Sequence, residues 1–415
     1  MRRIAVIGSG ISGISSAYLL SKKHVVDIYE ASPSLGGHTR TLTPDGIAVD
    51  TGFIVFNQKN YPHFEAFLTE LGIETSPSDM SFSVTAYDKS QYWGSDVPFG
   101  LFANKKNLIF PAFYRFLWGT HRFNQHCLQD LANNTHLDQS LGQYLKHHAI
   151  DQMVVDYYIL PMTSAIWSGS FRDVLAFPMR TFIQFWHNHQ LLEIGKGLPW
   201  KTLKGGSRRY LDKASEGISG SIHLNSGVER VSILGNDQVQ LYIKGQPMIY
   251  DAVVIATHAD QALSLLAEPT SLQTKLLKPW QYSNNTVCLH TDPSVMPPHK
   301  RAWSSWNLRR APNNADHLPV CVTYWMNRLQ PLNTPTNYFV TLNPLEPIAP
   351  NRCKNTTMLT HPIMNQASID TQAQLPLLNE GSRVVFCGSY FGHGFHEDGL
   401  RSAIESVKAL QITLA

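Results

Sequence analysis

One stretch near the N-terminus constrains the fold more than any other part of the chain. Residues 2–31 read RRIAVIGSGISGISSAYLLSKKHVVDIYEA: a short apolar strand, a glycine loop, a helix with an apolar side and a second strand. Gly8, Gly10 and Gly13 form a GxGxxG motif in the loop, and Glu30 ends the second strand. Strand, glycines, helix, strand and acid in this register are the fingerprint of a dinucleotide-binding βαβ unit. The sequence therefore predicts an α/β fold with a Rossmann-like domain.

Each residue type in this unit has a physical reason. Gly8 permits the tight turn, Gly10 lets a pyrophosphate approach the backbone, and Gly13 lets helix and strand pack closely. The helix N-terminus offers unpaired N–H groups to phosphates, and the acid can accept hydrogen bonds from a ribose. A glycine-rich turn without a ligand would not need the whole register. The predicted contacts in this unit are Gly8, Gly10, Ile11, Ser12, Gly13, Glu30 and Ala31.

The bulk properties exclude several classes of protein. A chain of 415 residues predicts two interlocked domains, and 43% hydrophobic with 16% charged residues indicates a folded globular protein. A net charge of +3 is too small to predict a nucleic-acid partner. The first strand leaves no room for a signal peptide, and no apolar run is long enough for a transmembrane segment. The 5 cysteines are widely spread and form no CxxC pair, so we predict reduced thiols in a cytoplasmic protein.

The segments after Glu30 distinguish between NAD and FAD. SPSLGGHTRTL (32–42) carries a second glycine pair, and VDTGF (49–53) follows it. Both resemble the flavin-containing amine oxidoreductase superfamily, which includes monoamine oxidases, protoporphyrinogen oxidases and phytoene desaturases. Its members carry a Gly-Gly-Arg/His-Thr segment after the ribose acid and an acid-x-Gly segment beside the flavin. The resemblance implies FAD, with contacts from Gly36, Gly37, His38, Thr39, Asp50, Thr51, Gly52 and Phe53.

Later segments extend the resemblance to the end of the chain. WKTLKGGSRRYLDKAS (200–215), SGVERVSI (226–233), YDAVVIATHADQAL (250–263) and FCGSYFGHGFHEDGL (386–400) resemble further cofactor segments of the superfamily. The last implies a closing flavin motif, with a helix beginning near Leu400 that aims its N–H groups at the flavin C2 carbonyl. The contacts implied by these segments are Val228 at the adenine, Thr257, Gly388, Ser389, Gly399 and Leu400.

The same C-terminal loop admits a rival interpretation as a metal site. His393, His396, Glu397 and Asp398 include good ligand types, but they belong to a loop that must already shape a flavin edge. We therefore predict no metal. His396 is instead our candidate catalytic residue, as a flavin-edge or proton-handling group.

The cofactor segments predict a discontinuous FAD-binding domain of the GR2 type, built from 1–85, 200–265 and 380–415. The segments between them, 86–199 and 266–379, predict an α+β substrate domain with helices and a mixed or antiparallel sheet. Four aromatic residues in its predicted strands are candidate substrate contacts: Tyr324, Trp325, Trp303 and Trp306.

A helix predicted over NLIFPAFYRFLWGTHRF (107–123) is apolar nearly all round, with Lys105, Lys106, Arg115 and Arg122 nearby. Such a helix can line an acyl-chain tunnel or contact a membrane surface peripherally. The third possibility, a buried helix of a large domain, is the one we expect.

Two departures from the superfamily bear on activity. Asn285 stands where amine oxidases carry a lysine near the flavin, and Gly399 stands where they place a cage tyrosine. Amine oxidation is therefore not expected. The cysteine that tethers flavin in some members would fall near His361, where none is present, so non-covalent FAD is expected.

A narrower resemblance points to lipids. PSDMSFSV, LPMTSAIWS, GGSRRY, ATHADQAL, YWMNRLQ and FGHGFHEDGLRS are similar to a bacterial family of FAD-binding proteins. Those proteins are encoded beside cyclopropane-fatty-acid-synthase-like methyltransferases and are linked to modified membrane lipids. The resemblance implies a lipid substrate and a neighbouring lipid methyltransferase as partner.

The sequence thus predicts an FAD-dependent oxidoreductase of desaturase or oxidase type, which takes hydride from an sp3 C–H bond of an apolar, fatty-acyl substrate. One alternative is an amine oxidase with a rebuilt aromatic cage. The other is a protein that uses FAD without net oxidation, as an isomerase or as a partner of a lipid enzyme.

Overall fold

A parallel five-stranded sheet carries the N-terminal fingerprint. The structure, a computed structural model, describes residues 1–193, 197–235, 238–312 and 320–414. The sheet has the order β10 (Ile222–His223), β2 (Val25–Tyr29), β1 (Arg3–Ile7), β14 (Ala252–Ile255) and β20 (Val384–Phe386). All four pairings are parallel, so the carboxyl ends of the strands meet at one edge. The predicted α/β fold class is confirmed.

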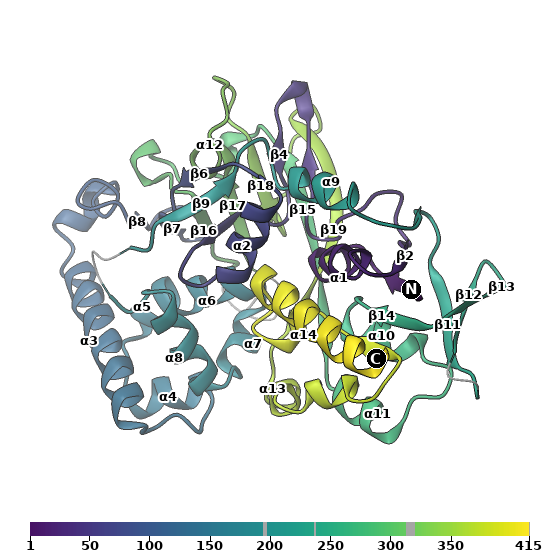
Figure 1. The fold of residues 1–415 in the computed structure, drawn as a ribbon. Coiled ribbons are helices and arrows are strands. Elements are labelled where there is room, and N and C mark those ends of the chain that lie inside the picture. The colour runs from purple at the N-terminus through teal and green to yellow at the C-terminus, as the bar shows by residue number, and fades with distance from the viewer. Residues whose placement is uncertain (194–196, 236–237, 313–319, 415) are drawn as a thin grey trace.

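Two helices far apart in sequence lie side by side on this sheet. They are α1 (Ile11–Ser21) and α14 (His396–Leu414), purple and yellow in Figure 1. Gly399 permits their close approach, because a Cβ there would lie 2.8 Å from Ser12 Oγ and 2.9 Å from Ile11 Cγ2. The two ends of the chain therefore pack against each other beside the same sheet.

A second, seven-stranded sheet forms the other half. Its order is β19 (Cys353–Ile363), β15 (Gln281–His290), β18 (Phe339–Leu342), β17 (Cys321–Trp325), β16 (Trp306–Arg309), β7 (Phe82–Thr85) and β8 (Tyr92–Gly94). Only the β16–β7 pairing is parallel. The two-domain division stays a prediction, and β7, inside the predicted 1–85 segment, pairs with the sheet of the other half.

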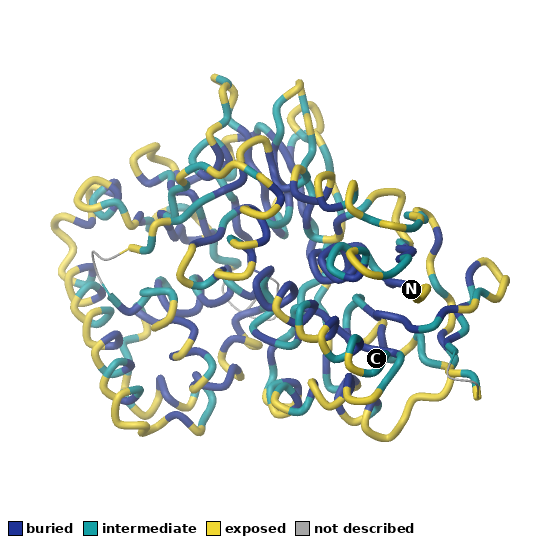
Figure 2. Tube along the Cα trace, viewed as in Figure 1, coloured by how far each residue is buried: buried dark blue, intermediate teal, exposed yellow. Residues whose placement is uncertain are grey.

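A helical lobe covers one side of the seven-stranded sheet, at the left of Figure 1. It comprises α3 (Pro111–Asn133), α4 (Leu141–His147), α5 (Gln152–Val154), a π-helical turn (Val155–Ile159), α6 (Leu160–Trp167), α7 (Phe171–Leu175) and α8 (Met179–Asn188). α3 begins at a proline, which is preorganised for the first helical position, and ends at Asn134 in the left-handed conformation. The buried stretches of these helices face inward in Figure 2.

Smaller elements complete the fold. They are β3 (Thr41–Leu42), β4 (Val49–Asp50), β5 (Val55–Asn57), α2 (Pro62–Glu70), β6 (Thr75–Ser78), β9 (Trp200–Leu203), α9 (Arg208–Ser215), β11 (Val228–Ile233), β12 (Val239–Ile243), β13 (Gln246–Tyr250), α10 (Ala259–Leu265), α11 (Ser271–Leu277), α12 (Met326–Leu329) and α13 (Gln366–Gln372). All five cysteines are free. Within the described ranges, no helix combines the length and the apolarity that a membrane crossing requires.

Candidate functional site

The glycine loop between β1 and α1 has one open face. Gly8 has a φ of +95°, and a Cβ on Gly13 would lie 1.9 Å from the Gly8 carbonyl oxygen, so both positions require glycine for the fold itself. Gly10 is different, because the nearest atom to a Cβ there would be the Gly36 carbonyl oxygen at 4.0 Å. Gly10 also caps α1 without a side-chain hydrogen bond. The open face beside an uncapped helix N-terminus fits an anion.

The second glycine pair packs against this loop. The N–H of Gly36 donates to Ser9 Oγ at 3.1 Å, and a Cβ on Gly37 would lie 3.5 Å from the Gly10 Cα. Ser9 in turn donates to Glu30 Oε2 from its N–H at 3.0 Å and from its hydroxyl at 2.5 Å. The ribose acid predicted at the end of β2 is therefore held beside the glycine loop.

The remaining predicted cofactor segments converge on the same edge. The Ser226 N–H donates to the Glu30 carbonyl at 2.8 Å, which brings the start of β11, with Val228, next to the end of β2. A Cβ on Gly388 would lie 3.4 Å from the Thr257 carbonyl oxygen, and one on Gly8 would lie 3.5 Å from Thr257 Cγ2. The open face at Gly10, the uncapped helix and the carboxylate thus fit the pyrophosphate and a ribose of FAD.

Asp50 holds the acid-x-Gly segment in place. Its carboxylate accepts hydrogen bonds from the Ser207 N–H at 2.9 Å and the Gln330 side-chain amide at 2.8 Å, and burial raises its pKa to about 6. A Cβ on Gly52 would lie 2.0 Å from the His38 carbonyl oxygen. Asp50 therefore joins β4 to the start of α9, and Gly52 lets the two cofactor segments run close together.

The closing motif differs from the expectation in one respect. α14 begins at His396, one turn before Leu400. The Gly399 N–H already donates to the Phe395 carbonyl at 3.1 Å, and Leu400 is buried in the core. The predicted helix start was wrong, because Asp398 accepts the backbone N–H groups of His393 and Phe395 and orders the first turn earlier.

The acids of this loop also have partners within the fold. Glu397 accepts the backbone N–H groups of His63 and Phe64, each at 3.0 Å, at the start of α2. Asp398 also pairs with Arg401 at 2.9 Å. Over the described ranges, no three His, Cys, Asp or Glu side chains are grouped to hold a metal ion.

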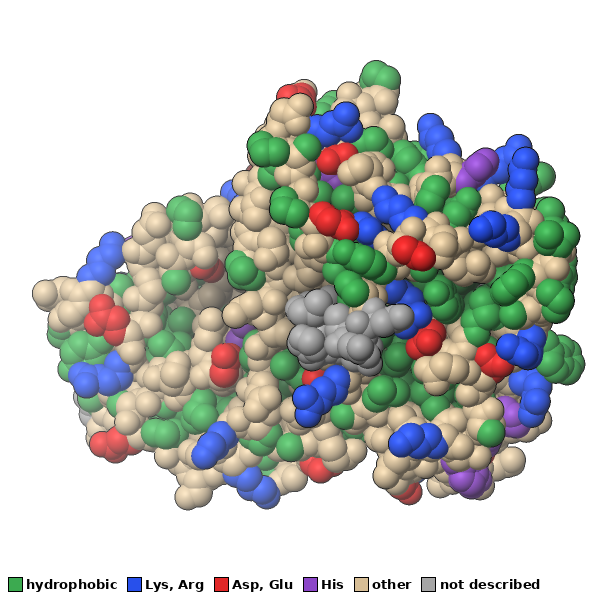
Figure 3. All heavy atoms as spheres, turned by 180° about the vertical axis from the view of Figure 1, so that it is seen from behind, with side chains coloured by type: hydrophobic (Ala, Val, Ile, Leu, Met, Phe, Trp, Pro, Cys, Tyr) green, Lys and Arg blue, Asp and Glu red, His purple; other side chains and the backbone are tan. Residues whose placement is uncertain are grey.

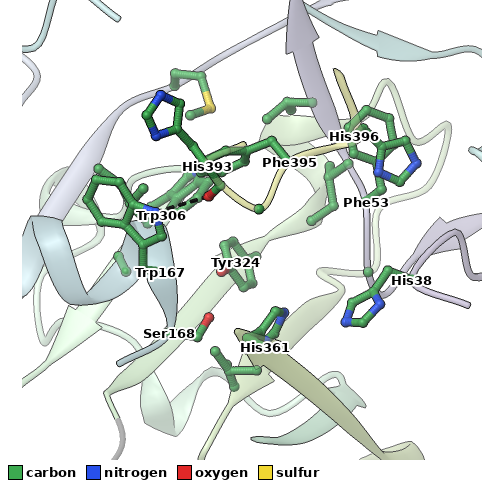
Figure 4. A pocket seen from close by; sticks show the side chains of 18 of the residues that line it. His38, Phe53, Trp167, Ser168, Trp306, Tyr324, His361, His393, Phe395 and His396 are labelled. Atoms are coloured by element: carbon green, nitrogen blue, oxygen red, sulfur yellow. Dashed lines mark hydrogen bonds between the residues drawn. The ribbon is translucent and has the colours of Figure 1, made fainter. Parts of the chain in front are cut away.

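A cavity of about 290 Å³ lies where the helical lobe, the seven-stranded sheet and the cofactor segments meet (Figure 4). α6 and α8 contribute apolar side chains from one side, and the sheet contributes them from the other. Apolar lining residues include Met162, Ile166, Phe185, Val287, Val340 and Leu359. Thr51, Gly52 and Phe53 line its cofactor side. The Trp167 indole N–H donates to the His393 carbonyl at 3.2 Å and joins the lobe to the C-terminal loop.

The described part of the cavity wall contains no Asp, Glu, Lys or Arg. Its five histidines are His38, His189, His361, His393 and His396. Burial lowers the pKa of each of them: to about 4 for His38 and His189, to about 3 for His361, and well below the ordinary value for His396. The wall is therefore uncharged near neutral pH.

Two of the four aromatic substrate candidates line the cavity. Trp306 and Tyr324 pack edge to face with ring centres 4.9 Å apart. Trp303 and Trp325 do not line it but pack on each other at 5.4 Å. Successive residues of β17 point to opposite faces of the sheet, which separates Trp325 from Tyr324. The geometry keeps the first pair as candidates and removes the second.

His396 lies at the cofactor end of the cavity and is firmly held. Its ring stacks on Phe53 with centres 3.6 Å apart, and its Nε2 lies 3.0 Å from the hydroxyls of both Thr39 and Tyr210. These contacts fix the orientation of a neutral imidazole. The predicted catalytic role stays a prediction, and the contacts favour a positioning function.

His361 was not predicted as a site residue. Asn285 donates from Nδ2 to His361 Nδ1 at 3.0 Å, and the His38 ring lies 5.1 Å from that of His361. His38 Nε2 is buried without a partner in the described structure. Asn285 was noted as the replacement for a lysine, and the pairing of β15 with β19, which puts His361 beside it, was the missing signal.

Comparisons with known proteins agree with this geometry. The family described as flavin containing amine oxidoreductase matches residues 11–342. Coproporphyrinogen III oxidase of Bacillus subtilis (strain 168) is 27% identical over 237 residues, 52% of this chain and 47% of the relative. The chain spans about half the length of the first curated relative it matches.

Two solved structures share the fold over nearly the whole chain. Cyclohexylamine oxidase from Brevibacterium oxydans IH-35A has a TM-score of 0.70 at 15% identity, covering 100% of this chain and 99% of that one. A fatty acid isomerase from P. acnes, described as producing CLA, has a TM-score of 0.67 at 11% identity with the same coverage. At these identities the likeness concerns the fold alone.

Proposed function

We propose that this chain, which belongs to the flavin containing amine oxidoreductase family, is an FAD-dependent oxidoreductase that acts on an apolar, fatty-acyl substrate. The reaction would remove hydride from one sp3 carbon and a proton from its neighbour, which leaves a double bond. FAD, when bound, supplies the two-electron acceptor and passes the electrons on to an oxidant such as dioxygen.

The observation that carries the proposal is the uncharged, mainly apolar cavity wall. An ammonium group brought into such a cavity would lose its hydration without gaining a carboxylate partner, which is costly. A methylene chain gains free energy when it leaves water for the same surroundings. The wall therefore favours an acyl chain over a charged amine.

Two unpaired polar atoms give such a substrate an orientation. The Trp306 indole Nε1 and the His38 Nε2 are both buried, belong to lining residues and have no hydrogen-bond partner in the described structure. A few placed polar groups in an apolar pocket fix how a ligand lies. We infer that the indole N–H binds an oxygen of the substrate and that the imidazole receives a polar group near the cofactor side.

Asn285 and His361 complete the site. The amide donates to His361 Nδ1, so the imidazole keeps its proton on Nε2 and stays neutral. An amide in place of a lysine adds no charge beside the flavin. We also infer non-covalent FAD, which is supported by the lack of a cysteine in the described cavity wall.

The test is the chain-length dependence of binding to the FAD-loaded protein. Each buried methylene contributes about 0.8 kcal/mol, so affinity should rise about fourfold per carbon until the cavity is full. Isothermal titration with a graded series of fatty acids, and with 1-alkylamines of the same lengths, measures this directly. Affinity that does not change with chain length, or tighter binding of the amines, would contradict the proposal.

A further inference from the structure

An exposed apolar surface lies on the helical lobe, away from the cofactor segments. Of the seventeen large hydrophobic side chains exposed in the described structure, seven fall between residues 97 and 118. Ile109 is 84% exposed, Val97 71% and Trp118 63%. We call this surface the docking patch; its members are Val97, Phe99, Leu108, Ile109, Phe110, Tyr114 and Trp118.

The patch is a built feature of α3 and the segment before it. Phe113 and Phe116 point into the core, so the inward side of the helix is satisfied. Phe110, Tyr114 and Trp118 are spaced by four residues and therefore form one outward stripe. Core packing explains the first set, whereas the side chains of the second set remain about half exposed to solvent. The expectation of a buried helix therefore holds only for the inward side of α3.

Basic side chains border the docking patch. Lys105 and Lys106 precede its central residues, Arg122 follows it on α3, and Lys300 and Arg301 approach from another segment, all exposed. The Arg301 guanidinium lies 5.8 Å from the centre of the Phe99 ring. Within the described ranges none of these five forms an ion pair. Figure 3 shows hydrophobic and basic side chains mixed along its right-hand edge, where the lobe lies when seen from behind.

An aromatic layer connects the patch to the cavity wall. Phe102, which contacts Tyr114, packs on Phe113 at 6.0 Å, and Phe113 packs on Phe116 at 5.6 Å. Trp93 continues the layer from Phe116 at 5.6 Å to Phe82 at 6.2 Å, and Phe82 lines the cavity. The patch and the cavity are therefore opposite sides of one packed layer.

We propose that the docking patch binds the surface of a lipid bilayer that contains anionic headgroups. Exposed aromatic and aliphatic side chains enter the interface, and unpaired lysines and arginines meet the phosphates. A second copy of the chain fits less well, since a symmetric dimer through the patch would set basic residues against basic residues. Binding stands on the surface alone, whereas a supply of acyl substrate from the bilayer rests on the proposed function.

The test is co-sedimentation of the FAD-loaded full chain with vesicles of phosphatidylcholine, with and without phosphatidylserine. The protein should bind the anionic vesicles, and the double variant Ile109→Glu, Trp118→Glu should bind at least about tenfold more weakly. Lys105→Gln with Lys106→Gln should weaken binding to anionic vesicles about fivefold per lysine and leave neutral vesicles unaffected. The matched control is Ile233→Glu with Ile412→Glu, at exposed positions outside the patch, which should bind like the parent.

Equal vesicle binding by the parent protein and the patch variant would overturn the inference. So would a parent protein that is dimeric while the patch variant is monomeric. Fatty-acid titration of the same proteins separates the two proposals. If the patch variant loses vesicle binding but keeps the chain-length dependence of fatty-acid affinity, docking is supported. If the parent protein does not bind vesicles, docking is contradicted and the proposed function is unaffected. If fatty-acid affinity does not depend on chain length but vesicle binding is retained, the proposed function is contradicted and docking is supported.

Discussion

Gly10→Ala is expected to abolish FAD binding and to leave the fold of the protein unchanged. Apart from its chain neighbours, no described atom lies closer than 4.0 Å to a Cβ at Gly10, but that Cβ occupies the face that a pyrophosphate must approach. Gly13→Ala is expected to impair both FAD binding and the stability of the fold, because its Cβ would lie 1.9 Å from the Gly8 carbonyl oxygen and the backbone would have to shift. That overpacking costs about 3 kcal/mol of stability.

The measurement is the flavin-to-protein ratio after purification, together with thermal unfolding of each variant stripped of flavin. Gly235→Ala is the control, since a Cβ there would meet none of the described atoms outside its chain neighbours within 4 Å. Comparison of the Gly10 and Gly13 variants distinguishes steric exclusion of the pyrophosphate from disruption of helix packing. A yellow Gly10→Ala protein would show that the open face does not hold the pyrophosphate.

Ile166→Trp is expected to abolish binding of long acyl chains while FAD remains bound. Ile166 is half-buried on α6 and lines the cavity, so the larger ring has empty space to enter. A ring that displaces three or four methylenes of the substrate should cost about a hundredfold in affinity at about 0.8 kcal/mol each. Ile249→Trp, on an exposed part of β13, is the matched control.

Fatty-acid titration and the flavin content of the two variants measure this effect. Ile166→Trp should keep its flavin and its affinity for the shortest fatty acids. Its affinity should no longer increase with the length of the acyl chain. If Ile166→Trp bound long chains like the parent, the acyl chain would have to lie outside this cavity.

The parallel sheet with its glycine loop was predictable because its constraints are local. Gly8, Gly10, Gly13 and Glu30 act within one βαβ unit, where turn geometry and helix packing dictate residue type at fixed spacing. The mixed or antiparallel sheet within residues 266–379 was predictable for a similar reason, since alternation of apolar side chains identifies a strand without knowledge of its neighbours.

The contacts at the cavity were less predictable because they depend on pairing between distant strands. His361 meets Asn285 only through the register of β15 with β19, seventy-six residues apart. To predict that Tyr324 lines the cavity and Trp325 does not, one must know on which face of the sheet the cavity lies. The exposure of Trp118 required knowing which side of α3 the core would take. Residue type alone decides none of these.

Anaerobic reduction of the bound flavin tests the central claim most directly. FAD-loaded protein is mixed, without oxygen, with a long-chain fatty acid, its acyl ester and the 1-alkylamine of equal length, and the loss of flavin absorbance is followed. We predict bleaching by the acyl compounds, with an unsaturated product in equal amount, and little by the amine. Bleaching by the amine alone would indicate an amine oxidase, and conversion of an unsaturated acid without any bleaching would indicate an isomerase; either result would contradict the proposed function.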